Sequence, residues 1–260
     1  MTIRNLAPAG APCWVDLWTS DVAAARRFYD ELFGWQAQEP SPEFGGYFMF
    51  HRGGVPVAGA MGDMGDMRAD NTWKVYLATS DVTAATAAVA ANGGQVMMPA
   101  YPVADLGSQS VLLDPEGATF GAWQAETFPG FTVLDEPGAP GWFELQTRSY
   151  DRALSFYGSV FGWDTDMVFD TEEMRYTTVV DPADRTPVAG IIDAANWLPE
   201  GSQEQWTIYW GTNDTEASVA DVVRLGGTVV DGPVDTPYGR IATVTDPMGT
   251  LFRLRTPPGA

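Results

Sequence analysis

The chain has 260 residues, of which 45% are hydrophobic, and a formal net charge of −20 at pH 7. A field of this sign repels phosphate backbones and anionic lipids, so we expect neither nucleic acid nor a membrane as partner. The single cysteine, Cys13, excludes an intrachain disulfide and a cysteine-rich metal site. No apolar run reaches the roughly 20 residues of a membrane span, and no secretory signal is visible, so the expected location is the cytoplasm.

The first predicted unit begins near residue 13. Residues 14–18 alternate as in a short strand, and Asp21 has the side chain of a helix N-cap. Apolar residues then recur at helical spacing from 22 to 33, and Gly34 ends the helix. Residues 47–50 and 55–60 are predicted strands joined by a glycine turn.

The second predicted unit begins at Trp73 with a strand, followed by the capping residue Asp81 and an alanine-rich helix over 82–91. Predicted strands cover 95–98, 109–113 and 119–123. Residues 114–117 have proline second and glycine fourth, the composition of a tight turn.

The remaining units repeat the first two. Residues 14–35 and 142–163 share their tryptophan, Phe-Tyr and Phe-Gly-Trp positions, and the segments at Trp73 and at Asp114 return at Trp206 and at Asp246. This internal duplication predicts four β-α-β-β-β units, near residues 13–62, 73–125, 141–194 and 205–256. We therefore expect an α+β chain with two domains, 1–130 and 141–260, joined by a linker over 131–140.

The pattern resembles the vicinal oxygen chelate superfamily of glyoxalase I, bleomycin-resistance proteins and extradiol dioxygenases, in its two-domain actinobacterial form. The resemblance rests on the strand–Asp–helix opening, on FYDELFGW and FYGSVFGW, and on the DPEG and DPMG turns. It implies two tandem glyoxalase-like domains with curved, cup-shaped sheets.

The resemblance also implies a divalent metal held by His, Glu or Gln on the first and last strands of the units. The corresponding residues here are Trp14, Lys74, Gly121, Trp142, Thr207 and Arg253. These positions supply neither an imidazole nor a carboxylate, so we expect no metal and no other cofactor. The only histidine, His51, ends a predicted strand and is interpreted as a surface residue, with a general base as the alternative.

Strand alternation predicts which side chains point into the cups, because the metal-ligand position of the family faces inward. Aromatic rings with a few charges dominate this set, which suits planar or cationic ligands. The alternative is that the rings fill the barrel as core, but burying unpaired charge there is costly. The predicted ligand-binding residues are Trp14, Asp16, Trp18, Met61, Lys74, Tyr76 and Trp123 in the first half, and Trp142, Glu144, Gln146, Thr207, Tyr209 and Arg253 in the second.

The pairing of the units has two solutions. Units one and two pair in the first, so Trp14 and Asp16 share a cup with Lys74 and Gly121. In the second, unit one pairs with unit four, and the same residues face Thr207 and Arg253.

The leading functional hypothesis is a metal-free protein that binds an aromatic or polycyclic small molecule, for antibiotic or polyketide sequestration, self-resistance or delivery to a tailoring enzyme. The alternative is a metal-independent isomerase, cyclase or hydroxylase-type tailoring enzyme. Asp16 or Glu144 is then the candidate base, and Lys74 or Arg253 the candidate enolate-stabilising group. The duplication supplies an internal pseudo-dimer, which suits a monomer, and we expect the cup of Trp14 to be the functional one.

Overall fold

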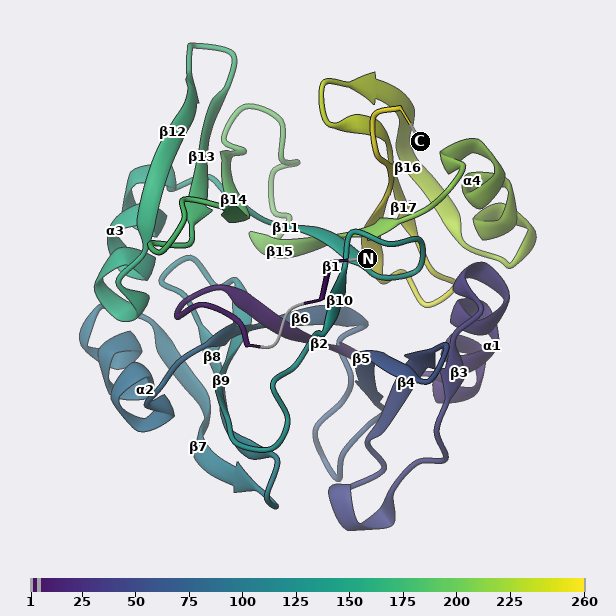
Figure 1. The fold of residues 1–260 in the computed structure, drawn as a ribbon, viewed down its shortest axis with the longest axis horizontal. Coiled ribbons are helices and arrows are strands. Elements are labelled where there is room, and N and C mark those ends of the chain that lie inside the picture. The colour runs from purple at the N-terminus through teal and green to yellow at the C-terminus, as the bar shows by residue number, and fades with distance from the viewer. Residues whose placement is uncertain (1, 4–5, 260) are drawn as a thin grey trace.

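The computed structural model describes residues 2–3 and 6–259 and contains two eight-stranded sheets, one in each half of the chain. The first sheet has the order β3 (Gln36–Ala37), β4 (Phe48–Arg52), β5 (Val55–Met61), β2 (Pro12–Trp18), β6 (Thr72–Ala78), β9 (Thr119–Ala125), β8 (Gly107–Leu113) and β7 (Gln95–Val103). The second has the order β12 (Asp164–Asp170), β13 (Arg175–Val180), β14 (Pro187–Asp193), β11 (Pro140–Thr147), β15 (Gln205–Gly211), β18 (Leu251–Thr256), β17 (Gly239–Thr245) and β16 (Thr228–Thr236). Figure 1 shows the two sheets as separate halves of the molecule.

Four helices complete the units: α1 (Val22–Phe33), α2 (Val82–Ala91), α3 (Tyr150–Phe161) and α4 (Thr215–Arg224). Asp21, Asp81 and Asp214 each accept a hydrogen bond from a backbone N–H in the first turn of the helix that follows, as the sequence predicts for the first two. Ser149, at the same place before α3, makes no such side-chain bond. In the part of the chain that the structure describes, none of the helices combines the length and apolarity of a membrane span.

The predicted α+β fold, with two tandem glyoxalase-like domains whose sheets form cups, is confirmed. Each sheet joins two consecutive units, because β2 pairs antiparallel with β6 and β11 pairs antiparallel with β15. The alternative in which unit one pairs with unit four is therefore wrong. Trp14 lies opposite Tyr76 and Asp16 opposite Lys74.

The predicted linker, residues 131–140, contains the short strand β10 (Val133–Leu134), which pairs with β1 (Thr2–Ile3). The acidic stretch that begins at Asp164 forms the exposed edge strand β12.

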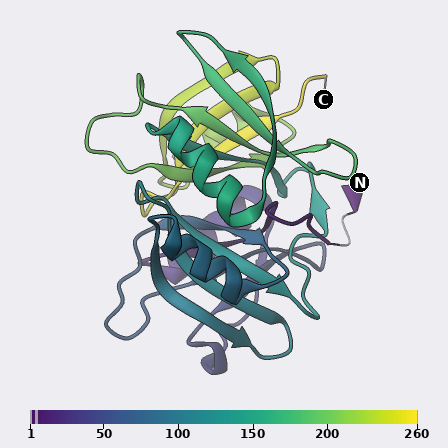
Figure 2. The same ribbon diagram turned by 90° about the vertical axis from the view of Figure 1, so that its left-hand side faces the viewer.

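The two halves are locked together by reciprocal contacts of their aromatic residues. The Tyr29 hydroxyl donates to Asp246 Oδ2 over 3.2 Å, and the Tyr157 hydroxyl donates to Asp114 Oδ2 over 3.1 Å. Beside them α1 lies next to α4 and α2 next to α3 (Figure 1), and Figure 2 shows the second of these pairs from the front.

The indoles that follow α1 and α3 also form hydrogen bonds outside their own half of the chain. Trp35 donates to the carbonyl oxygen of Gly138, and Trp163 donates to that of Gly10, each over 2.8 Å. Both rings are thus hydrogen-bonded outside their own half of the chain. The hydrophobic core is one cluster that includes residues of both halves.

Candidate functional site

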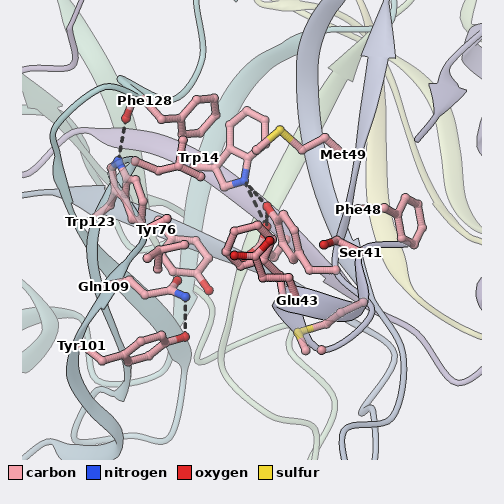
Figure 3. A pocket seen from close by; sticks show the side chains of 18 of the residues that line it. Trp14, Ser41, Glu43, Phe48, Met49, Tyr76, Tyr101, Gln109, Trp123 and Phe128 are labelled. Atoms are coloured by element: carbon pink, nitrogen blue, oxygen red, sulfur yellow. Dashed lines mark hydrogen bonds between the residues drawn. The ribbon is translucent and has the colours of Figure 1, made fainter. Parts of the chain in front are cut away.

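The cup of the first sheet holds a cavity of about 690 Å³. Strands β2, β4, β5, β6, β7, β8 and β9 supply its floor and walls, and the 3-10 turn η1 (Pro42–Phe44) also contributes residues. Figure 3 shows aromatic and sulfur-containing side chains turned toward a common space. These apolar lining residues include Trp14, Trp18, Phe44, Tyr47, Phe48, Met49, Met61, Met64, Tyr76, Met98, Tyr101, Trp123 and Phe128.

A buried carboxylate lies at the floor of this cavity. Trp14 Nε1 donates to Asp16 Oδ1 over 3.0 Å, and the Tyr47 hydroxyl donates to the same oxygen over 2.8 Å. Trp14 Nε1 also lies 3.0 Å from the Tyr47 hydroxyl oxygen, so the three side chains form a closed triangle. Asp16 is only 5% exposed, and the hydrogen bonds from Trp14 and Tyr47 hold its carboxylate in place.

Two glycines make room for this arrangement. A Cβ at Gly59 would overlap the Tyr47 hydroxyl and the Asp16 carboxylate, and one at Gly121 would overlap the ring of Tyr76. Both residues lie on strands next to the aromatic side chains they admit, β5 and β9. The close packing of the floor depends on the absence of these two side chains.

Burial raises the pKa of Asp16 to about 6. Hydrogen bonds from Tyr47, Tyr76 and Trp14, and the positive charge of Lys74, oppose this rise. Asp16 is therefore ionised at pH 7 yet takes up a proton only slightly below neutrality. A carboxylate of this kind can accept a hydrogen bond or a proton from a molecule in the cavity.

Lys74 does not reach the cavity, although it faces Asp16 in the sheet. Its Nζ lies 4.5 Å from the centre of the Trp18 ring and donates to Asp70 Oδ2 over 2.7 Å and to Thr72 Oγ1 over 2.8 Å. The structure thus places the amine at the start of strand β6, against the Trp18 ring, and Lys74 is not among the described residues that line the cavity.

Six of the seven residues predicted for the first cup line the cavity: Trp14, Asp16, Trp18, Met61, Tyr76 and Trp123. Sequence reasoning missed others, above all Tyr47, Tyr101 and Gln109, whose amide donates to the Tyr101 hydroxyl (Figure 3). Tyr47 and Met49 are two residues apart, directly before and within strand β4, so their side chains share one face of the sheet. Alternation along the predicted strand 47–50 could have indicated both residues.

The second cup repeats the frame of the first, an indole that donates to a tyrosine hydroxyl, but different side chains lie beside it. Trp142 Nε1 donates to the Tyr176 hydroxyl over 2.9 Å, as Trp14 does to Tyr47. Arg253 Nη1 donates to Glu144 Oε1 over 2.9 Å, and the guanidinium lies 5.0 Å from the centre of the Tyr209 ring.

The other predicted residues of this cup lie around the Arg253–Glu144 pair. Gln146 donates to Glu144 Oε1 over 3.3 Å, and Thr207 is buried with no hydrogen-bond partner for its hydroxyl among the described residues. The centre of the second cup is therefore occupied by an ion pair of the chain itself.

The residues present do not fit the metal that the resemblance implies. The six positions expected to carry ligands hold indole, amine, hydroxyl or guanidinium groups, or no side chain at Gly121. Across residues 2–3 and 6–259, no group of three or more His, Cys, Asp or Glu side chains is arranged to hold a metal ion. His51 lies on β4, half-buried, and is not among the described residues that line the cavity.

Two family models match the chain, one in each half. Residues 13–122 match a glyoxalase-like domain, and residues 139–254 match the glyoxalase/bleomycin resistance protein/dioxygenase superfamily. The matches divide the chain between the two sheets.

Several relatives are similar along almost the whole chain. DauV of Streptomyces sp. strain C5 and DnrV of Streptomyces peucetius, both named anthracycline biosynthesis proteins, are 37% identical over 259 residues, covering 94% of this chain and 92% of theirs. CFP32 of Mycobacterium tuberculosis, provisionally called a glyoxylase, is 37% identical over 95% of each chain.

Solved structures share the fold at low identity. A Mn(II)-bound glyoxalase from Novosphingobium aromaticivorans has a TM-score of 0.62 and 16% identity, over 96% of this chain and 83% of that one. A variant of homoprotocatechuate 2,3-dioxygenase from B. fuscum has a TM-score of 0.61 and 13% identity, over 100% of this chain and 76% of the other.

Proposed function

Because the chain belongs to the glyoxalase/bleomycin resistance protein/dioxygenase superfamily, we propose that its first half binds an aromatic or polycyclic small molecule without a metal. The observation that carries this proposal is the cavity of about 690 Å³ with its aromatic and methionine walls. Small-molecule sites usually span about 300–1,000 Å³ and combine apolar walls with a few fixed polar groups. The triangle of Trp14, Asp16 and Tyr47 is the fixed polar group here.

The walls suit a flat ligand. Phe128 packs edge-on against Trp14, with ring centres 4.8 Å apart, and its carbonyl oxygen accepts a hydrogen bond from Trp123. A planar molecule that enters the cavity removes apolar surface from water and stacks on rings that are already held in place. The flexible thioethers of Met49, Met61 and Met98 adapt to its outline.

The names of DauV and DnrV support a polycyclic product of antibiotic biosynthesis as the ligand. In this proposal the protein works in the cytoplasm, where it sequesters such a molecule or delivers it to a tailoring enzyme. In this proposal no metal takes part, because the residues at the six positions where the family carries its metal ligands do not fit a metal ion.

A second candidate is a metal-independent tailoring enzyme that acts on the same molecule. The buried Asp16, with its raised pKa and the nearby Tyr76 hydroxyl, supports this candidate as a base facing the cavity. Mass spectrometry of a ligand after incubation with substoichiometric protein separates the two functions, since an enzyme converts many equivalents and a binding protein leaves the ligand unchanged.

Tryptophan fluorescence tests the proposal directly. We expect 1,8-dihydroxyanthraquinone to quench the emission saturably, because Trp14, Trp18 and Trp123 line the cavity. Trp14→Ala should weaken binding by about 1–3 kcal/mol, the scale of a lost aromatic contact. Trp197→Ala is the matched control, because this indole is exposed in the other half. Absence of saturable binding by the intact protein would contradict the proposal.

A further inference from the structure

The duplicated frame allows the two cups to be compared residue by residue. Asp16 and Glu144 occupy the same place on β2 and β11, and each lies beside an indole that donates to a tyrosine hydroxyl. Tyr76 and Tyr209 occupy the same place on the next strand of each sheet. Each cup therefore presents one carboxylate near its centre, with a tyrosine ring on the neighbouring strand beside it.

The cups differ at two positions that carry a cation, and at the first of these Lys74 lies opposite Asp16 where Thr207 lies opposite Glu144. At the second, Tyr209 lies beside Arg253 across β15 and β18, whereas Tyr76 lies beside Gly121 across β6 and β9. In the second cup the guanidinium lies both against the carboxylate of Glu144 and over the ring of Tyr209. The first cup has the carboxylate and the ring, but at Gly121 it has no side chain to supply the cation.

Among the described residues, Lys74 is a cation whose charge acts on Asp16, but its amine does not line the cavity. The described residues that line the cavity include Asp16, Glu39 and Glu43 but no lysine, arginine or histidine. Lys74 is bound to Asp70 at the start of the strand. Asp16 accepts hydrogen bonds from Trp14, Tyr47 and Tyr76, and since a carboxylate has about four acceptor sites, it keeps capacity for one more donor.

We propose that the aromatic ligand of the first cavity carries a cationic amine, which lies between the Asp16 carboxylate and the Tyr76 ring where Arg253 lies in the second cup. This inference rests on the proposed function. The amine would form a desolvated, charge-assisted hydrogen bond with Asp16 and a cation–π contact with Tyr76. The net charge of −20 favours the approach of a cation and disfavours that of an anion.

Three matched probes test the proposal: 9-(aminomethyl)anthracene as the cation, 9-(hydroxymethyl)anthracene as its neutral counterpart and anthracene-9-carboxylate as the anion. Fluorescence titrations at pH 7.5 compare the intact protein with Asp16→Asn, which keeps the shape of the side chain and removes its charge. Asp231→Asn removes one charge at an exposed position of β16 in the other half and is the control.

We expect the amine to bind about tenfold or more tightly than the alcohol, and the carboxylate to bind more weakly than both. Asp16→Asn should bring the amine and the alcohol to within about twofold, whereas Asp231→Asn should retain the preference. Equal binding of amine and alcohol by the intact protein, or a preference that survives Asp16→Asn, would overturn the inference and leave the aromatic site intact. Binding of none of the three probes would overturn the site as well.

Discussion

The carboxyl group of Asp16 gives binding a defined pH dependence. Lys74, Tyr47, Tyr76 and Trp14 surround it, and its pKa of about 6 lies below the range in which an aliphatic amine loses its proton. We therefore expect the affinity for 9-(aminomethyl)anthracene to be nearly constant from pH 8 to about pH 7, to be about halved near pH 6 and to fall further below it, as Asp16 becomes neutral. The measurement is a series of fluorescence titrations.

The neutral alcohol and the Asp16→Asn protein supply the controls for this pH series. Both should give a flat profile across the same range, because neither pairs a cation with an ionised Asp16. A fall of equal size in the Asp16→Asn protein would assign the titration to another group, such as the rim residues Glu39 and Glu43.

The strands and helices differ in how they tolerate an added methyl group. Gly59→Ala should displace the Tyr47 hydroxyl and the Asp16 carboxylate, and should cost about 1–3 kcal/mol of stability together with ligand affinity. Gly158 lies in α3, and a Cβ added there would meet no other atom within 4 Å. Gly158→Ala should therefore stabilise the protein by about 0.5–1 kcal/mol. Chemical denaturation of both variants measures the contrast.

A Gly59→Ala protein with unchanged binding would mean that the triangle at the floor is not needed. In that case the ligand would have to be held by the walls alone. A loss of stability in Gly158→Ala would show that α3 packs more tightly than its surroundings indicate.

The order of elements was predictable because each β-α-β-β-β unit carries local signals. Asp21 and Asp81 cap helices, and Gly34 ends one in the left-handed conformation. Two inward residues of β2, Trp14 and Asp16, followed from alternation together with the resemblance, because a strand has only two faces and the family's ligand position indicates which one faces inward. These signals lie within a few residues of the structure they specify.

Other parts of the site depend on distances that no local signal encodes. Alternation gave the face of Lys74, but the four-carbon chain of lysine lets its amine reach Asp70 instead of the cavity. Tyr101 belongs to β7, whose strand extends to Val103, well beyond the predicted end at 98. The pairing of units was open because both solutions keep every strand pattern, and only long-range packing selects between them.

The molecule as a whole should bind one ligand tightly. The first cup holds a cavity, whereas an ion pair of Arg253 and Glu144 lies at the centre of the second. We expect isothermal titration calorimetry with 9-(aminomethyl)anthracene to give a stoichiometry of about one per chain, because breaking a buried ion pair is costly. Two sites of equal affinity would contradict this division between the cups.

The stability of the whole molecule should increase in mild acid. Burial raises the pKa of Asp16 and of Asp114 to about 6, and it also raises that of Asp246. The folded chain thus holds these protons more tightly than the unfolded chain, so lowering the pH from about 6 toward the ordinary value of 3.8 favours folding. The thermal unfolding midpoint should rise between pH 7.5 and pH 5.

Asp114→Asn isolates the contribution of one carboxyl group. The amide oxygen can still accept from the backbone N–H groups of Glu116 and Ala118, as the carboxylate does. Because its amide nitrogen cannot accept from the Tyr157 hydroxyl, this variant is compared with itself across pH, and it should gain less stability than the parent on acidification. An identical gain in both proteins would place the titrating groups elsewhere.

The reciprocal bonds of Tyr29 and Tyr157 to the opposite half resemble the contact of two identical subunits. In a symmetric pair of separate chains, every substitution appears in both cups at once, so a change that empties one also empties the other. Joining the copies in one polypeptide removes that constraint. Gly121 and Arg253 stand at one duplicated position, and there the copies have diverged: the cup with Gly121 holds a cavity, whereas the side chain of Arg253 pairs with Glu144 at the centre of the other.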